Sequence, residues 1–177
     1  DILRLKNLLT VLDEQKHIWA KTSSDNHIEI FEKIKKNLMH ISKDWVSLAA
    51  KHKGILASDP LIGEEWMSGP YALMSACNAF IKTFTDLKNN NSIINLKTRE
   101  LGNGQLSVNV VPSSIWDRLI LSGVTAEVWM QPEVNRNNLN NYVAKHLKTP
   151  ISGRKGKVAL VLGAGNISSI APLDCFQ

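Results

Sequence analysis

The apolar run over residues 158–162, Val-Ala-Leu-Val-Leu, leads directly into Gly163, Ala164, Gly165 and Asn166 and limits the folds open to this chain. An unbroken apolar run of this length is typical of a strand buried on both faces of a parallel sheet. Glycines directly after such a strand allow the backbone to approach a ligand closely. Because open α/β sheets bind ligands beyond the carboxyl ends of their strands, the run predicts the start of a nucleotide-binding α/β sheet.

A buried parallel strand needs neighbouring strands, and the sequence predicts none beside this one. The chain begins at Asp1 without a methionine and reaches Gln177 soon after the glycines. We therefore expect an N-terminal part of a larger protein, with a truncated sheet. The alternative is a small α+β domain whose last strand closes a sheet already formed.

Four segments make up the expected organisation, and the fold class is α/β. They are an N-terminal helical region (1–92), a β-hairpin and oligomerisation-type segment (93–134), an Asn-rich loop with a basic linker (135–156), and the start of the truncated nucleotide-binding domain (157–177).

Local patterns support the first two segments. In the helical region, apolar residues recur every three or four positions from Phe31 to Leu48, and Gly54 provides a C-terminal stop. A further helix is expected to begin at Gly69 and Pro70. Residues 105–111 alternate between apolar and polar side chains, which predicts a half-buried strand.

The turn Gly102-Asn103-Gly104 is expected to join that strand to residues 94–99 as a hairpin. Residues 125–130 are a further strand candidate. Short helices are expected over residues 115–121 and 142–147.

Charge and cysteine content exclude several classes of protein. The net charge is +5 and the isoelectric point about 9.3, but the basic residues are dispersed, so we expect no nucleic-acid partner. No apolar run approaches the roughly 20 residues of a membrane span. The two cysteines and five histidines have no metal-ligand spacing. We therefore expect a cytoplasmic protein without a metal site.

The sulfur and indole side chains are interpreted as structural. Cys77 lies on an apolar helix stripe, and Cys175 follows an aspartate that would disfavour a thiolate, so both are expected to be buried thiols. Four indoles are expected to anchor the core: Trp45, Trp66, Trp116 and Trp129.

Residues 163–168 nearly match the dinucleotide-binding pattern G-x-G-x-x-G, with Ser168 in place of the third glycine. In that pattern a helix begins within the glycine turn. Pro172 would then lie inside the helix, where it removes a hydrogen bond and clashes with the preceding turn. The sequence instead predicts that the turn continues to Ser169 or Ile170 and that the helix begins near Pro172.

Asn166 is the polar residue of this turn with the clearest chemical potential. A side-chain amide at the end of a rigid strand can donate a hydrogen bond to a developing oxyanion. Equally, an asparagine at this position can serve only the turn conformation or cap the backbone. The spacing does not distinguish these two roles.

The order of these elements resembles the aldehyde dehydrogenase superfamily. Trp19, the helix that contains residues 31–34 and 45–49, and Gly54 resemble the opening of that family, and residues 157–166 look like its first cofactor-domain strand. The proline-containing turn at 168–173 matches the family's connection to the next helix. The family's common Pro-Trp-Asn is here Ala164-Gly165-Asn166, which is closer to the related acyl-CoA reductases.

The resemblance implies an NAD- or NADP-dependent oxidoreductase that acts on an aldehyde or acyl thioester through a cysteine thiohemiacetal. It implies that Asn166 is the catalytic oxyanion donor and that Gly163, Ala164 and Gly165 face the cofactor. The catalytic cysteine and general-base glutamate of the family would lie beyond Gln177, so this chain alone is expected to be inactive. A homo-oligomer is expected.

Two other functions remain open from the sequence. One is a different nucleotide-binding oxidoreductase that uses Gly163 and Gly165 in an ordinary fingerprint. The other is a non-catalytic helical interaction module, whose surface would be the basic helix face around Lys36 and Lys43.

Overall fold

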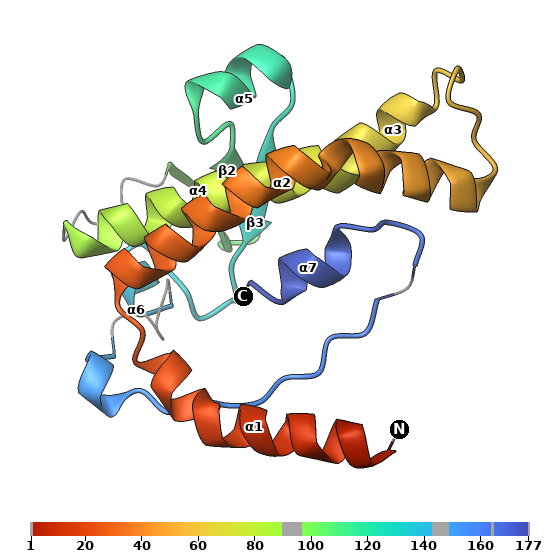
Figure 1. Cartoon of the computed structure of the whole chain (residues 1–177). Helices are drawn as coiled ribbons and strands as arrows, with labels where there is room; N and C mark the ends of the chain where they lie inside the picture. The colour runs from red at the N-terminus through yellow and green to blue at the C-terminus, as the bar shows by residue number, and fades with distance from the viewer. Residues whose placement is uncertain (1, 90–96, 143–148, 164, 177) are drawn as a thin grey trace. The chain divides into compact units, whose positions relative to one another are not determined.

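The computed structural model describes residues 2–89, 97–142, 149–163 and 165–176. It combines helices with a three-stranded antiparallel sheet, which agrees with the α/β class at the coarse level. The chain divides into two compact units, a helical unit of Asp1–Asn89 with Ile151–Gln177 and a sheet unit of Asn90–Pro150. Figure 1 labels the elements of both.

The helical unit begins with α1 (Ile2–Ala20) and α2 (Ser24–Lys53). The Ser23 side chain accepts a hydrogen bond from the Asn26 N–H, which satisfies one of the unpaired donors at the start of α2. Gly54 ends α2 in the left-handed region, with φ of 71°, where glycine carries no steric penalty. The predicted helix and its glycine stop are confirmed.

The second long helical arm begins earlier than predicted. It consists of α3 (Ile62–Trp66), the π-helical turn η1 (Met67–Tyr71) and α4 (Ala72–Lys88). The prediction that the helix starts at Gly69 and Pro70 is wrong. Pro70 has no N–H and would break a regular helix, but the wider π turn accommodates it within a continuous helical arm.

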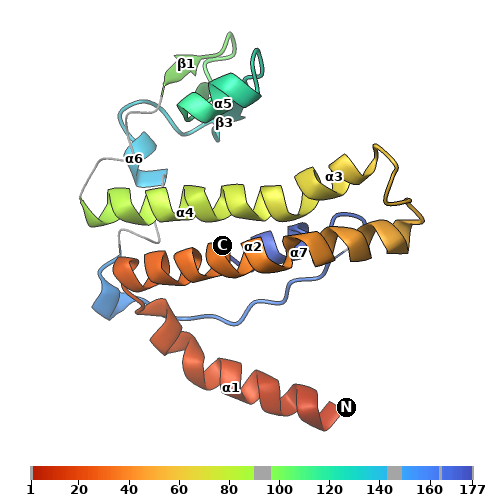
Figure 2. The same ribbon diagram turned by 45° about the horizontal axis from the view of Figure 1, so that its top comes forward.

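Helices α2 and α4 pack along one another, as Figure 2 shows. The buried residues of α2 recur at helical spacing, and α4 contributes Leu73 and Cys77 to the same interface. The rings of Phe31 and Phe80 stack across it at a centroid distance of 5.0 Å. The α2 residues in this core are Phe31, Leu38, Ser42, Val46 and Ala50.

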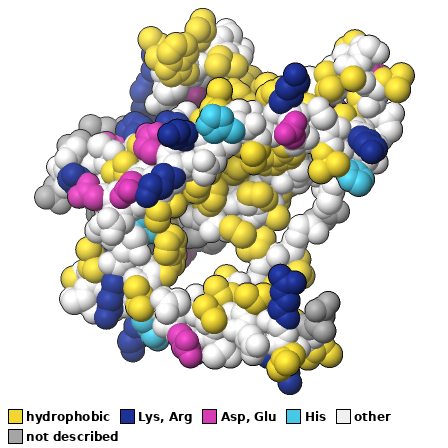
Figure 3. Space-filling view, viewed as in Figure 1, with side chains coloured by type: hydrophobic (Ala, Val, Ile, Leu, Met, Phe, Trp, Pro, Cys, Tyr) yellow, Lys and Arg dark blue, Asp and Glu magenta, His cyan; other side chains and the backbone are white. Residues whose placement is uncertain are grey.

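Helix α1 differs from this pair because none of residues 2–20, all of which the structure describes, is buried. Its leucines are about half exposed, for example Leu9 at 48% and Leu12 at 52%. Figure 3 shows apolar side chains along the face of α1 that is in view. The backbone of Gly156 contacts α1 through a 3.2 Å hydrogen bond from its N–H to His17 Nδ1.

The sheet unit contains β1 (Thr98–Glu100), β2 (Leu106–Val111) and β3 (Ala126–Trp129), in the order β1-β2-β3 with both pairs antiparallel. The glycine turn before β2 has Gly104 at φ of 79°. The predicted hairpin and third strand are therefore confirmed where they are described, whereas residues 94–96 lie outside the described residues.

Two short helices complete the sheet unit, and its core is small. Helix α5 (Ile115–Ile120) begins with a capping box formed by Ser114 and Asp117, and it confirms the helix predicted over residues 115–121. Helix α6 (Leu139–Tyr142) lies earlier than predicted, and residues 143–147 of that prediction lie outside the described residues. The buried core comprises Leu106, Val108, Val134 and Leu139, with Met130 packed against it.

The last part of the helical unit contains the short 3₁₀ turn η2 (Ile151–Gly153) and α7 (Ile170–Asp174), with an extended segment between them. The predicted strand over residues 158–162 is not formed, and its side chains are not buried: Leu160 is 83% and Leu162 82% exposed. A strand needs a partner for its backbone groups, and no strand pairs with this segment among the described residues.

The exposed apolar side chains of residues 158–162 should make the chain associate. We expect purified residues 1–177 to bind a hydrophobic dye and to form larger species as concentration rises, because contiguous exposed apolar surface is unfavourable in water. Sedimentation and dye fluorescence would measure this. A variant with Leu160→Asp and Leu162→Asp should associate less, and a strictly monomeric wild-type chain without dye binding would contradict the expectation.

Candidate functional site

The candidate site is the turn of residues 165–169, which connects the extended segment to α7. Gly165 occupies the left-handed region with φ of 85°, and α7 begins at Ile170 after Ser169. Pro172 is therefore the third residue of the helix, where its missing N–H costs no helical hydrogen bond. The prediction that the turn continues to Ser169 or Ile170 is confirmed.

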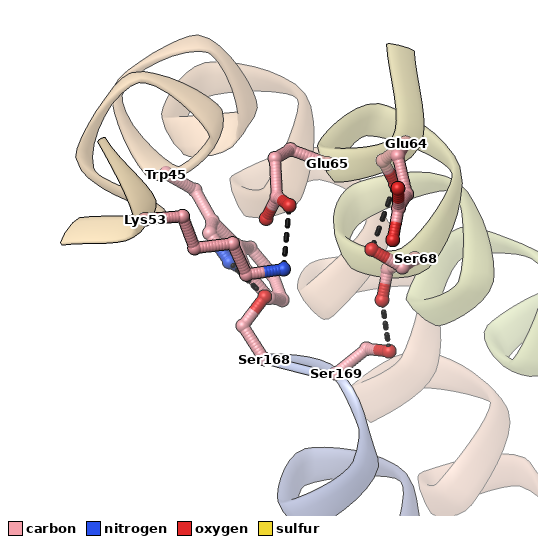
Figure 4. A network of polar contacts seen from close by, with 7 residues as sticks. All are labelled: Trp45, Lys53, Glu64, Glu65, Ser68, Ser168 and Ser169. Carbon is pink, nitrogen blue, oxygen red and sulfur yellow. Dashed lines mark hydrogen bonds and ion pairs between the residues drawn. The ribbon is translucent and has the colours of Figure 1, made fainter. Parts of the chain in front are cut away.

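Two consecutive serines attach this turn to the two helical arms, which are α2 and the continuous arm of α3, η1 and α4. Trp45 on α2 donates from Nε1 to Ser168 Oγ at 2.8 Å. Ser169, which is 1% exposed, donates from Oγ to the backbone carbonyl of Ser68 in η1. Figure 4 shows Ser168 directed toward Trp45 and Ser169 directed toward Ser68. The turn is thus held by one contact to each arm.

The π turn creates the acceptor that Ser169 uses. In a regular helix the Ala72 N–H would donate to the carbonyl of Ser68, but here it donates to Gly69. The Ser68 carbonyl can then accept from Ser169. A Cβ at Gly69 would lie 3.5 Å from Ser168 Oγ and 3.6 Å from the Trp45 ring, so the glycine backbone lies directly against this contact.

A part-buried ion pair joins the end of α2 to α3. Lys53 Nζ lies 2.6 Å from Glu65 Oε1, and the Glu65 side chain is only 2% exposed. A buried carboxylate without a partner would be strongly unfavourable, so the positive charge of Lys53 stabilises Glu65 in its buried position. Figure 4 shows this pair beside the serine contacts. We interpret it as structural, because both charges are satisfied.

Helix α7 is held by an aromatic contact at its end. The Phe176 ring meets Phe31 edge to face at a centroid distance of 5.2 Å and an angle of 85°, and it lies 6.2 Å from Phe80. The serine contacts at one end and Phe176 at the other fix α7 on the α2/α4 pair.

The thiols and indoles only partly follow the sequence interpretation. Cys77 is fully buried, and burial raises the pKa of its thiol, as expected for a core residue. Cys175 is exposed, so its prediction as a buried thiol is wrong. Three of the four indoles predicted for the core are exposed instead, at 41% for Trp66, 66% for Trp116 and 62% for Trp129. Trp45 is half-buried.

Two of the sequence-predicted site residues, Gly165 and Asn166, are exposed in the anchored turn. Asn166 is exposed, and among the described residues none forms a hydrogen bond with its amide. Gly165 is also exposed, and open space surrounds the position of a Cβ there. Gly163 lies against α7, since a Cβ would be 3.3 Å from Ala171 Cβ. Ala164 lies outside the described residues. Sequence reasoning missed Trp45, Ser68 and Ser169.

Comparison of the chain with protein-family models, with curated proteins and with solved structures gives no match. Within the described residues, no group of three or more histidine, cysteine or acidic side chains is placed to hold a metal ion. None of the helices in those ranges is both long and apolar enough to cross a membrane.

A second polar cluster lies on the sheet unit and has a structural role. Arg99 donates to both carboxylate oxygens of Glu127, at 2.8 Å and 2.6 Å, and Ser107 Oγ donates to the same carboxylate at 2.8 Å. These bonds, the Arg99 bond first, lower the pKa of Glu127 to about 2. The cluster links all three strands.

The contribution of the cluster of Arg99, Ser107 and Glu127 to stability should depend on pH. Because the pKa of Glu127 falls from 4.5 in the unfolded chain to about 2 in the fold, the stabilisation is complete above pH 4.5 and is lost as the pH falls toward 2. Hydrogen exchange of residues 106–111 against pH would measure it. Glu127→Gln should exchange faster than wild type at neutral pH and no faster near pH 2. A constant difference across this range would contradict the assignment.

Proposed function

We propose that residues 1–177 form the N-terminal part of an NAD- or NADP-dependent aldehyde dehydrogenase-like oxidoreductase that acts on an aldehyde or acyl thioester through a cysteine thiohemiacetal. The observation that carries the proposal is the anchored turn. Helix α7 begins only at Ile170, and Ser168 and Ser169 bind the helical arms. Gly165 and Asn166 are exposed in this turn, which leaves the Gly165 backbone and the Asn166 amide accessible to a ligand.

In this proposal the Asn166 amide donates a hydrogen bond to the oxyanion of the thiohemiacetal. The backbone of Gly163, Ala164 and Gly165 would hold the nicotinamide ribose. The residues are compatible with such a group, because Gly165 is exposed and no described atom beyond its chain neighbours lies within 4 Å of the position of a Cβ there. The nicotinamide would accept or supply the hydride, and the nucleophilic cysteine would come from a segment beyond Gln177.

The exposed side chains of the 158–162 segment support the same proposal. Val158 is 42%, Leu160 83% and Leu162 82% exposed, although all three are strongly apolar. Parallel strands on both sides of the segment would satisfy its backbone, and helices packed on the two faces of such a sheet would bury its side chains. We propose that those strands belong to the cofactor-binding sheet. A cytoplasmic location and homo-oligomeric assembly are part of the proposal.

The test is turnover by the enzyme expressed from the complete coding sequence. Oxidation of aldehydes and reduction of acyl thioesters would be followed through the absorbance of reduced nicotinamide, with NAD and NADP compared. We expect activity in one direction and its loss when the nucleophilic cysteine is alkylated. No nicotinamide-linked activity with either substrate class, or a coding sequence that holds no downstream cysteine, would reject the proposal.

The ordinary dinucleotide fingerprint is the weaker enzyme alternative. That fingerprint requires a helix that begins within the glycine turn, so that its first N–H groups face the pyrophosphate. Here α7 begins at Ile170, beyond the last position of the Gly163–Ser168 pattern. This geometry favours the aldehyde dehydrogenase-like proposal.

A helical interaction module is the non-enzymatic alternative, and the exposure of α1 favours it. Lys36 and Lys43 on α2 are also exposed, whereas Lys33 and Lys35 pair with Glu29 and Glu32. An acidic or nucleic-acid partner should bind tightly at low salt and far more weakly at physiological salt. Absence of binding to both at low salt would remove this alternative.

A further inference from the structure

We propose that Trp45 and Ser169 are positioning residues that hold Asn166 in place by fixing the 165–169 turn on the helical arms. This inference deepens the proposed function and rests on it for the role of Asn166. The anchoring itself rests only on the contacts of the helical unit. Figure 4 shows both contacts together.

The two contacts restrain the turn in different directions. Trp45 reaches Ser168 from α2, and Ser169 reaches the Ser68 carbonyl in η1. Two consecutive residues are therefore bound to two separate elements, so that movement of the turn away from either element would break one of the two hydrogen bonds. Asn166 lies only two residues before Ser168, and each residue of chain spans at most about 3.6 Å.

Ser169 is buried, whereas Trp45 is half-buried beside the core of α2. Trp45 precedes Val46, which is 2% exposed in the α2 core. Ser169 is 1% exposed. Replacement by alanine would therefore leave the Ser68 carbonyl without the hydrogen bond that Ser169 donates. The Trp45 Nε1–H is the donor to Ser168, and a phenylalanine ring keeps the apolar contact while it removes this donor.

Precise placement matters for an oxyanion donor. A displacement of about 1 Å at a reacting group can cost roughly a hundredfold in rate. Loss of either anchor should therefore act on the chemical step, while contacts that do not involve the turn should be unaffected. This distinguishes a positioning role from a general contribution to stability.

The first experiment measures the turn directly in the chain. Hydrogen exchange of peptides that cover residues 165–176 would be compared in wild type, Trp45→Phe and Ser169→Ala. We expect exchange of the hydrogen-bonded amides that follow the turn, such as that of Leu173, which donates to the Ser169 carbonyl, to rise roughly five- to tenfold in each variant. Matched controls are Trp66→Phe, which alters an exposed indole, and Ser47→Ala, which removes an exposed hydroxyl bonded to the Lys43 carbonyl of its own helix.

Two results of this experiment would overturn the anchoring. One is that exchange over residues 165–176 stays at the wild-type rate in both variants. The other is an increase spread equally over α2 and α4, which would mean that the helical unit as a whole is destabilised. A thermal melt of each variant separates the second result from local loosening. Ser169→Thr, which restores the hydroxyl, should return the exchange rate toward wild type.

The second experiment uses the complete enzyme and separates this inference from the proposed function. Trp45→Phe and Ser169→Ala should lower kcat roughly ten- to a hundredfold and leave the KM for the nicotinamide cofactor unchanged. If Asn166→Ala lowers kcat but neither anchor variant does, the positioning role is wrong and the proposed function stands. If Asn166→Ala itself leaves kcat unchanged, the role of Asn166 fails, and with it this inference.

Discussion

In the enzyme that we propose, replacement of Asn166 by alanine is expected to lower the rate of the chemical step about a hundredfold, because an oxyanion donor stabilises mainly the transition state. Cofactor affinity should be nearly unchanged, since the contacts that we propose between Gly165 and the cofactor use backbone atoms. Single-turnover kinetics with saturating nicotinamide cofactor would measure the chemical step, and equilibrium titration would measure the affinity.

A scaffolding role for Asn166 predicts a different outcome. Loss of a structural hydrogen bond would reduce stability by about 1 kcal/mol and leave the rate of the folded enzyme unchanged. The Asn166 side chain is exposed, and no described residue forms a hydrogen bond with it, so we expect its replacement to leave the thermal melt unchanged. A lowered melting temperature with an unaltered chemical step would assign Asn166 to the scaffold.

Local signals in the sequence predicted the local structure well. The Gly54 stop of α2 follows from the conformational freedom of glycine, which acts within a few residues of the helix end. The alternation before Pro112 and the turn at Gly104 likewise fix β2 and its hairpin. In each case the cause and the effect lie close together in the chain.

Predictions failed where distant parts of the chain decide the outcome. The rule that proline begins a helix misplaced the second arm, because the π turn around Pro70 depends on packing that the local sequence does not specify. The exposure of Trp116 and Trp129 depends on whether any other element covers them. The 158–162 segment has the composition of a strand, but strand formation also requires a partner.

The candidate site was also predictable only in part. The late start of α7 was predictable, because Pro172 excludes a regular helix from the glycine turn onward. The anchors of that turn were not predictable, since Trp45 and Ser168 are 123 residues apart and serine and tryptophan have many possible roles. The serine pair before Ile170 was the only local signal.

The largest effect on stability is expected at Phe31. Its side chain is 4% exposed, and its ring contacts those of Phe80 and Phe176 at centroid distances of 5.0 Å and 5.2 Å. Phe31→Ala removes buried apolar surface and leaves a cavity between α2 and α4, which together typically cost about 3–5 kcal/mol. Chemical denaturation followed by helical circular dichroism would measure the loss.

The same substitution tests how α7 is held. Because Phe31 joins the α2/α4 interface to Phe176, its loss should also accelerate hydrogen exchange in residues 170–176. Met39→Ala is the matched control, since Met39 lies on the same helix but is 69% exposed and should change stability little. If Phe31→Ala and Met39→Ala cost the same, Phe31 does not lie in the core. If Phe31→Ala destabilises the helical arms while exchange in α7 stays at the wild-type rate, the serine contacts alone are sufficient to hold α7.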